Sequence, residues 1–209
     1  MMELGVDGTK AAGEPAADRL AQPCAPFIET ASGGQFWYVD RGRDEEDIRI
    51  GDIAHHLAQE SRFCGATKEW YSVARHSLNV LEEFRRRMPS ATPTAQRLAL
   101  LHDAHEAYTK DLPKPLRQLP QLAGFNELAK DVQERIERRF QAYGDAALRA
   151  EIKLIDLVLL RTEALALMPS GGRHLYWPPG VESTHDMKLS GWEWKVDQRD
   201  FLAAFLSCW

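Results

Sequence analysis

Two histidines and two carboxylates occupy four of five consecutive positions in this chain, directly after an apolar run: His102, Asp103, His105 and Glu106. Two further polar groups stand in amphipathic or apolar stretches elsewhere, His76 near the start of one and Asp156 within another. On helices that face a core, such groups cost free energy unless they are paired or bound to a cation. Three separate stretches of the sequence therefore supply side chains that suit a shared metal ion.

Imidazole nitrogens combined with carboxylate oxygens favour some divalent ions over others. This mixture suits Mn, Fe, Co, Ni or Zn better than Ca, which prefers oxygen ligands alone. We expect one divalent metal ion, Mn, Co, Zn, Fe, Ni or Mg, whose identity these residue types leave open. Neighbouring residues on an α-helix point about 100° apart, so His102 and Asp103 would share an ion only at the edge of a helix.

The order of these residues along the chain resembles that of a known family. A histidine, a His-Asp pair and a later aspartate on successive predicted helices look like the motif of the HD-domain metal-dependent phosphohydrolases. The segment His102-Asp-Ala-His-Glu106, followed by Asp111-Leu-Pro, is similar to the branch that contains the bacterial 5′-deoxynucleotidases. Ser61-Arg-Phe-Cys-Gly65 and Tyr71-Ser-Val-Ala-Arg-His76-Ser are similar to small bacterial and phage-borne HD hydrolases. The resemblance covers residues 27 to 168.

The resemblance implies a role for each matching residue. It implies that one divalent ion is bound by four protein ligands: His76, His102, Asp103 and Asp156. It further implies that Glu106 orients or deprotonates the attacking water, and that Asp111 is the acid that serves the leaving oxygen. Arg62 resembles the arginine that binds the substrate phosphate.

Elementary chemistry favours the same reaction. A phosphate monoester is dianionic and repels hydroxide, and a bound metal ion both neutralises this charge and lowers the pKa of its water. Glu106 stands four residues after His102, on the same helical face, so its carboxylate would reach that water. The planar guanidinium of Arg62 matches phosphate oxygens. Lys114 adds positive potential beside Asp111 and is the second predicted substrate-binding residue.

These residues predict a metal-dependent phosphohydrolase that cleaves a small phosphate ester, with a (deoxy)nucleoside monophosphate as the expected substrate, by attack of metal-bound water. Two other classes stay open. A nucleotide-sensing module would keep the metal and the pocket without turnover, and a bare helical scaffold would bind no metal at all. Within the same superfamily, the substrate would instead be a diester, triphosphate or pyrophosphate, because the depth of the pocket decides how much phosphate fits.

The elements that must position these groups are predominantly helical. Apolar residues recur at helical spacing, and capping residues, prolines and glycines mark the ends of the stretches. We expect helices over residues 52–59 with Asp52 as the cap, 72–88, 93–108, 124–143, 145–168 and 195–206. A Ser-Gly-Gly turn within residues 27–39 predicts a small hairpin, and two prolines make residues 111–116 a loop. The fold class is all-α, an HD-domain helical bundle with a small irregular or hairpin N-terminal segment and a loop-rich C-terminal tail.

The length of 209 residues, of which 44% are hydrophobic, suits one domain with a sizeable core. Residues 1–24, rich in Ala, Gly and Pro, predict a mobile leader. We expect the phosphohydrolase domain over residues 25–168, and a C-terminal extension over residues 169–209 that packs on the same domain.

Composition also indicates the compartment and the partners. The formal net charge of −5 argues against a dedicated nucleic-acid surface. The sequence lacks a signal-like apolar region near its start and any apolar run approaching 18 residues, and its three cysteines are widely spaced, so we expect a cytoplasmic protein without a membrane span. The predicted partner is a small phosphorylated substrate, expected to be a nucleotide. The exposed faces of the helices over residues 124–168 could support a homodimer, which nothing in the sequence specifies.

Overall fold

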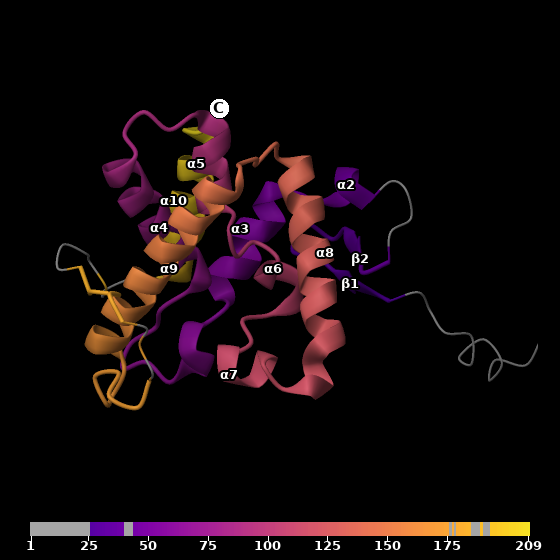
Figure 1. Ribbon diagram of the computed structural model, residues 1–209. Helices are drawn as coiled ribbons and strands as arrows, with labels where there is room; N and C mark the ends of the chain where they lie inside the picture. The colour runs from indigo at the N-terminus through magenta and orange to yellow at the C-terminus, as the bar shows by residue number, and fades with distance from the viewer. Residues whose placement is uncertain (1–25, 40–43, 176, 178, 185–188, 190–192) are drawn as a thin grey trace, which may run out of the picture.

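The computed structural model describes residues 26–39, 44–175, 177, 179–184, 189 and 193–209. This part of the chain is mostly helical and carries a small two-stranded hairpin at its N-terminal end (Figure 1). The predicted helical fold class with an N-terminal hairpin is confirmed, whereas its assignment to the HD domains stays a prediction. The predicted leader, residues 1–24, lies outside the described residues. No helix of the described ranges is both long enough and apolar enough to cross a membrane.

The elements follow one another along the chain as two strands, two short 3-10 helices and a series of α-helices. The strands and 3-10 helices are β1 (Phe27–Glu29), β2 (Gln35–Trp37), η1 (Arg62–Gly65) and η2 (Pro120–Leu122). The α-helices are α2 (Asp44–Asp47), α3 (Ile50–Gln59), α4 (Val73–Arg87), α5 (Pro93–Leu100), α6 (Glu106–Thr109), α7 (Lys114–Arg117), α8 (Ala123–Arg139), α9 (Ala146–Leu167) and α10 (Trp194–Leu206).

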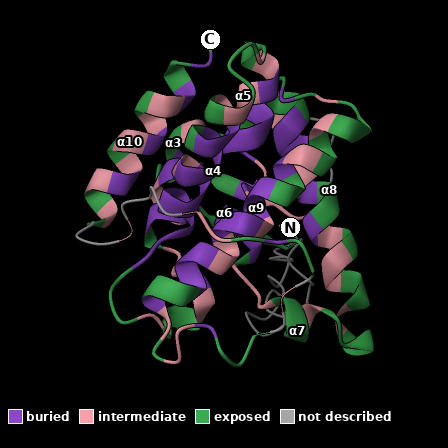
Figure 2. Cartoon of the chain, turned by 60° about the vertical axis from the view of Figure 1, so that its left-hand side comes forward, coloured by how far each residue is buried: buried purple, intermediate pink, exposed green. Residues whose placement is uncertain are grey.

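Helices α3 and α4 form the centre of the molecule. Helix α4 contacts α3, α5, α9 and α10, and α3 also contacts α6 and α10. The central ribbons are accordingly the most deeply buried, as Figure 2 shows. One hydrophobic cluster connects these helices to the hairpin and to α8, with Phe36, Leu57, Phe84, Ile136 and Phe201 among its members. A single core therefore supports α4, α6 and α9, the helices that carry His76, Glu106 and Asp156.

The hairpin packs on the short helix α6. Strand β1 pairs antiparallel with β2, with Phe27 opposite Trp37, and Gly33 adopts φ +76° in the turn, a conformation that glycine reaches without strain. Phe36 is buried and stacks on Tyr108 of α6, with ring centroids 3.8 Å apart. The predicted hairpin thus stabilises the helix on which Glu106 lies.

The prediction that Asp52 caps a helix is wrong. Helix α3 begins two residues earlier, at Ile50, and Arg49 occupies the cap position. Asp52 is buried in the first turn instead, where it accepts hydrogen bonds from the backbone N–H of Ser32 at 2.7 Å and from its hydroxyl at 2.9 Å. The carboxylate therefore joins the hairpin turn to α3, a long-range contact that overrides the local capping preference.

Two further boundaries differ from the expected ones. The loop predicted over residues 111–116 ends early, because α7 begins at Lys114. Proline is compatible with a first helical turn, where a backbone N–H donor is not needed, so Pro115 does not prevent this helix. Helix α8 ends at Arg139 rather than at Tyr143, since Gln141 adopts φ +50° and turns the chain out of the helix.

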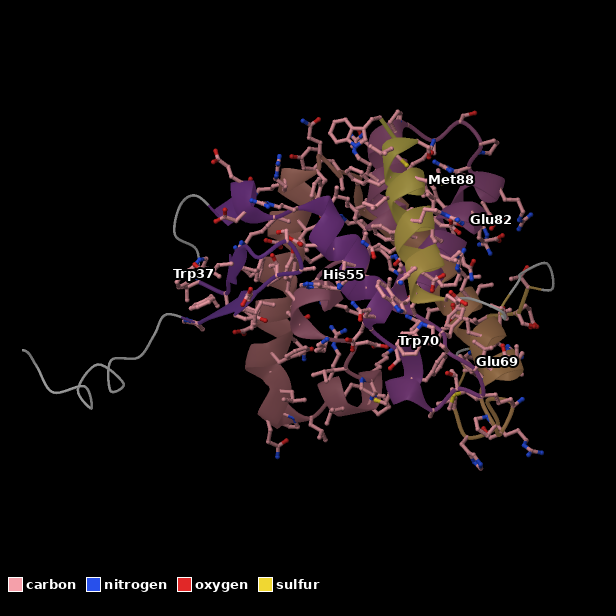
Figure 3. The ribbon with its side chains drawn as sticks, turned by 180° about the vertical axis from the view of Figure 1, so that it is seen from behind. Trp37, His55, Glu69, Trp70, Glu82 and Met88 are labelled. Carbon is pink, nitrogen blue, oxygen red and sulfur yellow. The ribbon has the colours of Figure 1, made fainter. Side chains whose placement is uncertain are left out.

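Helix α10 lies across α3 and α4, as the view from behind in Figure 3 shows. Ser72, the N-cap of α4, accepts a hydrogen bond from the backbone N–H of Arg75 and donates its hydroxyl to the carboxylate of Asp197 on α10. The guanidinium of Arg75 donates to Asp197 at 2.9 Å and to Asp200 at 3.0 Å. This buried network holds the first turn of α4, on which His76 lies.

We expect Asp197→Ala to lower the free energy of unfolding by about 3 kcal/mol, because it removes a buried charge partner of Arg75. Denaturant unfolding measures this change. Asp200→Ala is the matched control, since the carboxylate of Asp200 is more exposed and such pairs contribute less than about 1 kcal/mol. Equal effects of the two variants would contradict the importance of the buried pair.

Candidate metal centre

The helix expected over residues 93–108 is interrupted. Helix α5 ends at Leu100, and residues 101–105 form turns before α6 begins at Glu106. The side chain of Gln133, from α8, lies at the interruption. Its amide NH₂ donates to the carbonyl of Leu101 at 2.8 Å, and its amide oxygen accepts from the backbone N–H of His105 at 3.1 Å. These two backbone groups would bond to each other in a continuous α-helix, so Gln133 takes the place of one helical hydrogen bond.

This break in the helix corrects the expectation that His102 and Asp103 meet only at a helix edge. In the turn, the two neighbouring side chains reach the same point, with Nε2 of His102 lying 3.1 Å from Oδ2 of Asp103. The angular separation of about 100° that an α-helix imposes does not apply to a turn. Gln133 therefore creates the local geometry in which an HD pair offers two ligands to one ion.

The four predicted metal ligands lie together. His76 comes from α4, His102 and Asp103 from the turn before α6, and Asp156 from α9. One donor atom of each lies within 4.8 Å of the donor atoms of the other three. Nε2 of His76 is 3.1 Å from Oδ1 of Asp156 and 4.0 Å from Oδ2 of Asp103. Two imidazoles and two carboxylates in this arrangement can hold a first-row divalent metal ion.

The hydrogen bonds of the histidines fit this set of ligands. His102 donates from Nδ1 to the carbonyl of Ala99 at 3.0 Å, which leaves the lone pair of Nε2 directed at the cluster. This buried Nε2 has no hydrogen-bond partner among the described residues, and neither has Oε2 of Glu106. A buried acceptor without a donor costs free energy, and a cation bound to it removes that cost.

A carboxylate that the sequence analysis missed stands behind His76. Glu163 of α9 is fully buried and accepts from Nδ1 of His76 at 2.7 Å, from the hydroxyl of Tyr71 at 2.8 Å and from Nε of Arg62 at 3.1 Å. A carboxylate in this place orients a metal-binding imidazole and makes it a stronger ligand. The signal in the sequence was its position, seven residues after Asp156 and hence on the same face of the helix.

Charge pairing dominates the protonation of these buried groups. Burial alone would lower the pKa of His76, but the carboxylates of Glu163 and Asp156 outweigh it and raise this pKa to about 9. Burial would likewise raise the pKa of Asp156, yet the hydrogen bond from His76 and the charge of Lys153 hold it below its usual range. The carboxylates of Glu163 and Asp156 therefore favour the protonated form of His76.

Arg62, the predicted phosphate-binding residue, lies beside the cluster. It is buried in η1, and its charge interacts with Glu163, Asp156, Asp111 and Asp103. The next two residues, Phe63 and Cys64, adopt φ values of +56° and +52°, which non-glycine residues rarely do. Strained backbone of this kind is found where the surrounding structure must place a particular side chain.

The two predicted catalytic carboxylates also lie near the cluster. Glu106 is buried in the first turn of α6, and burial together with the charges of Asp103 and Asp111 raises its pKa well above the usual value. Asp111 follows Lys110, whose φ of +74° turns the chain away from α6. Burial raises the pKa of Asp111 as well, against the opposing effect of Arg62.

Lys114 and His105 differ in exposure: Lys114 is exposed to solvent, whereas His105 is buried. Lys114 is exposed on α7, and no hydrogen bond or ion pair joins it to the cluster within the described ranges, so its substrate-binding role stays a prediction. His105 is buried, and its Nδ1 lies 2.9 Å from the hydroxyl of Thr109. Burial lowers the pKa of His105 to about 4, which makes this imidazole neutral at pH 7.

Two cavities flank this region. The smaller, about 200 Å³, is bordered by His102 and Asp103 and lies between α5, α8 and α9. The larger, about 780 Å³, lies between the hairpin, α3, α6 and α8, and none of the four ligands borders it. The smaller cavity therefore gives access to two of the four predicted metal ligands.

The fold and the site define a helical protein with a buried cluster of two histidines and two aspartates. No family model matches the sequence. The chain is 33% identical over 164 residues to the uncharacterized protein YfdR of Escherichia coli K12, a match that covers 76% of this chain and 82% of YfdR. It is 38% identical over 122 residues to the uncharacterized protein RCAP_rcc00048 of Rhodobacter capsulatus, covering 56% of this chain and 62% of that protein. The chain belongs to the YfdR family.

We expect Gln133→Leu to weaken divalent metal binding at least tenfold. The variant leaves the carbonyl of Leu101 and the N–H of His105 either unpaired, at a cost of about 1–3 kcal/mol, or bonded to each other in a continuous helix that separates the ligands. Titration with Mn²⁺ measures the affinity, and Gln121→Leu at an exposed position is the control. Unchanged affinity in Gln133→Leu would contradict the role given to the helix break.

We expect Glu163→Gln to lower metal affinity between about tenfold and a hundredfold, because His76 loses the carboxylate that orients its ring. The same titration measures the loss, and the thermal unfolding midpoint shows whether the variant is folded. Glu151→Gln, on the same helix but half-buried and paired with Arg87, should bind the metal as the unmodified protein does. If both variants bind equally well, Glu163 does not support the ligand.

Proposed function

We propose that this protein is a metal-dependent phosphohydrolase of the HD type that cleaves a small phosphate ester, with (deoxy)nucleoside monophosphates as the substrate class. The observation that carries the proposal is the convergence of three further groups, Arg62, Glu106 and Asp111, on the cluster of four ligands. A site that only bound a metal would not need an arginine and two additional carboxylates at the same place.

His76, His102, Asp103 and Asp156 would hold the ion. When bound, a divalent ion would offset part of the phosphate charge and lower the pKa of a water molecule. Arg62 supplies the complementary part of phosphate binding. Its Nε is occupied by Glu163, and this ion pair aims the planar guanidinium, whose remaining N–H groups match phosphate oxygens. A buried arginine held in this way loses little side-chain entropy when a phosphate binds.

Glu106 and Asp111 have complementary tasks in this proposal. Glu106 lies next to Asp103, with a carboxylate oxygen that no described residue engages, and it would accept the proton of the attacking water. Asp111 lies in the segment between α6 and α7, where the raised pKa of its carboxyl suits the donation of a proton to the leaving oxygen. The two carboxylates thus supply the base and the acid that hydrolysis of an ester requires.

A nucleotide-sensing module is the alternative from another class. A sensor needs the ligands and Arg62, but neither a base nor an acid. The burial of Glu106 among other acids costs free energy, and a sensor gains nothing from that cost, which favours hydrolysis. Diesters, triphosphates and pyrophosphates stay alternative substrates of the same site, and a cytoplasmic homodimer remains the proposed form of the protein.

We expect Glu106→Gln to keep the metal and to lose between about 10² and 10⁴ in turnover, the usual contribution of a positioned general base. The experiment measures phosphate release from a panel of nucleoside monophosphates with Mn, Co, Zn, Mg and Ni, together with metal content by mass spectrometry. Glu134→Gln, at an exposed position of α8, should retain full turnover.

Phosphate release and metal content, measured together, distinguish the hypotheses. Metal-dependent phosphate release that disappears in Glu106→Gln supports the phosphohydrolase. Stoichiometric metal without phosphate release from any ester in the panel would contradict it and support the sensing module. If the unmodified protein takes up no divalent ion, both proposals fail and the cluster is part of a scaffold.

A further inference from the structure

The small cavity of about 200 Å³ has the metal ligands His102 and Asp103 on one side and α9 on the other. Two cations of α9, Arg149 and Lys153, line it. They stand one turn apart, and Asp156 follows three residues after Lys153, so all three side chains share one face of the helix. Two positive charges of this face therefore lie at the cavity, next to the metal ligands His102 and Asp103.

The two cations differ in how they are paired. Arg149 forms two hydrogen bonds with the carboxylate of Glu137, at 3.1 and 2.6 Å, and this pair is neutral as a whole. Lys153 is bonded to Oδ2 of Asp156, although 64% of its own side chain is exposed. Its partner is thus a predicted metal ligand, whereas the partner of Arg149 is not.

Charge balance predicts what a bound ion would do to this pair. The carboxylates of Asp103 and Asp156 together carry two negative charges, which a divalent ion balances. The ammonium of Lys153 would then share the charge of Asp156 with the ion, while it stays at the cavity beside the ligands. A cation that is only partly neutralised at the edge of a small cavity attracts an anion.

The size of the cavity limits that anion. Sites that enclose a drug-sized ligand usually measure about 300–1,000 Å³, so 200 Å³ suits a phosphate group but not a whole nucleotide. Along α9, Lys153 lies before Asp156, and Glu163, the partner of Arg62, lies two turns after it. Two turns of helix span about 11 Å, so Lys153 and the partner of Arg62 lie on either side of Asp156 along α9.

We propose that Lys153 is a phosphate-binding residue that receives the phosphoryl group of the substrate at this cavity, opposite Arg62. This inference rests on the proposed function, because it requires a divalent ion at Asp103 and Asp156. According to this inference, one phosphate group of the substrate enters the cavity, and the remainder of the ester lies outside it.

The test uses the full chain loaded with Mn²⁺ and measures its affinity for orthophosphate by titration calorimetry, which requires no turnover. Lys153→Met should bind orthophosphate about tenfold more weakly, the loss expected for one charge-assisted hydrogen bond. Lys153→Arg keeps the charge and should restore binding to within about threefold. Lys130→Met removes an exposed lysine of α8 and should leave the affinity unchanged.

Metal affinity provides the readout that a merely structural role would not produce. Lys153→Met removes an ammonium that competes with the ion for Asp156, so it should bind Mn²⁺ at least as tightly as the unmodified protein while it binds orthophosphate more weakly. Opposite changes of the two affinities support the inference. A parallel loss of both would overturn it, because it would show that the variant damages the site as a whole.

The failure of this inference is distinguishable from that of the proposed function. If Lys153→Met binds orthophosphate as tightly as the unmodified protein, Lys153 is not the phosphate-binding residue, and phosphate release from esters continues to test the hydrolase. If the unmodified protein takes up no Mn²⁺, the inference and the proposed function fall together. If Lys153 governs phosphate binding but no ester is hydrolysed, the inference stands and the hydrolase does not.

Discussion

The site depends on the side-chain amide of Gln133. Its hydrogen bonds to the carbonyl of Leu101 and the N–H of His105 replace the bond that these two groups would form with each other in a continuous helix. An amide can do this because it donates and accepts at once, so neither backbone group is left unpaired. The cost of ending a helix inside the protein is thereby offset. The gain is a turn in which His102 and Asp103 reach one point, and from which α6 restarts with Glu106 already buried beside them.

Helix α9 organises the rest of the site along one face. Asp156 supplies a ligand, and Glu163, two turns later, holds both His76 and Arg62. A single straight helix thus sets the distance between the metal ligands and the group proposed to bind phosphate. Because Arg62 and His76 share the same carboxylate, a change at Glu163 would alter both the candidate metal ligands and the residue proposed to bind phosphate. The C-terminal helix contributes from the other side, since Asp197 holds the first turn of α4 on which His76 lies.

Features of the fold that depend on neighbouring residues in the chain could be predicted from the sequence. The hairpin, the start of α4 at its Ser72 cap and the start of α9 at its Asp145 cap follow from turn and capping residues. The four ligands could be found because polar groups in apolar runs are costly. The break before α6 could not, because it depends on Gln133, which is near in space but about thirty residues away in the chain. Asp52 was misassigned for the same reason, since its partner Ser32 is a long-range contact.

The charges of the site argue that it is built for a cation rather than for stability. Five carboxylates and three cations interact there: Asp103, Glu106, Asp111, Asp156 and Glu163 with Arg62, His76 and Lys153. Carboxylates outnumber cations in this group, and burial next to Asp103 and Asp111 raises the pKa of Glu106, so the acids repel one another. Buried ion pairs contribute less to stability than apolar packing of the same volume, so a scaffold has no reason to gather them. An excess of buried acids at a point where two histidines offer Nε2 is therefore hard to reconcile with a bare helical scaffold. Two histidines and two aspartates in this arrangement could hold a divalent ion, whose charge would offset the repulsion among the carboxylates.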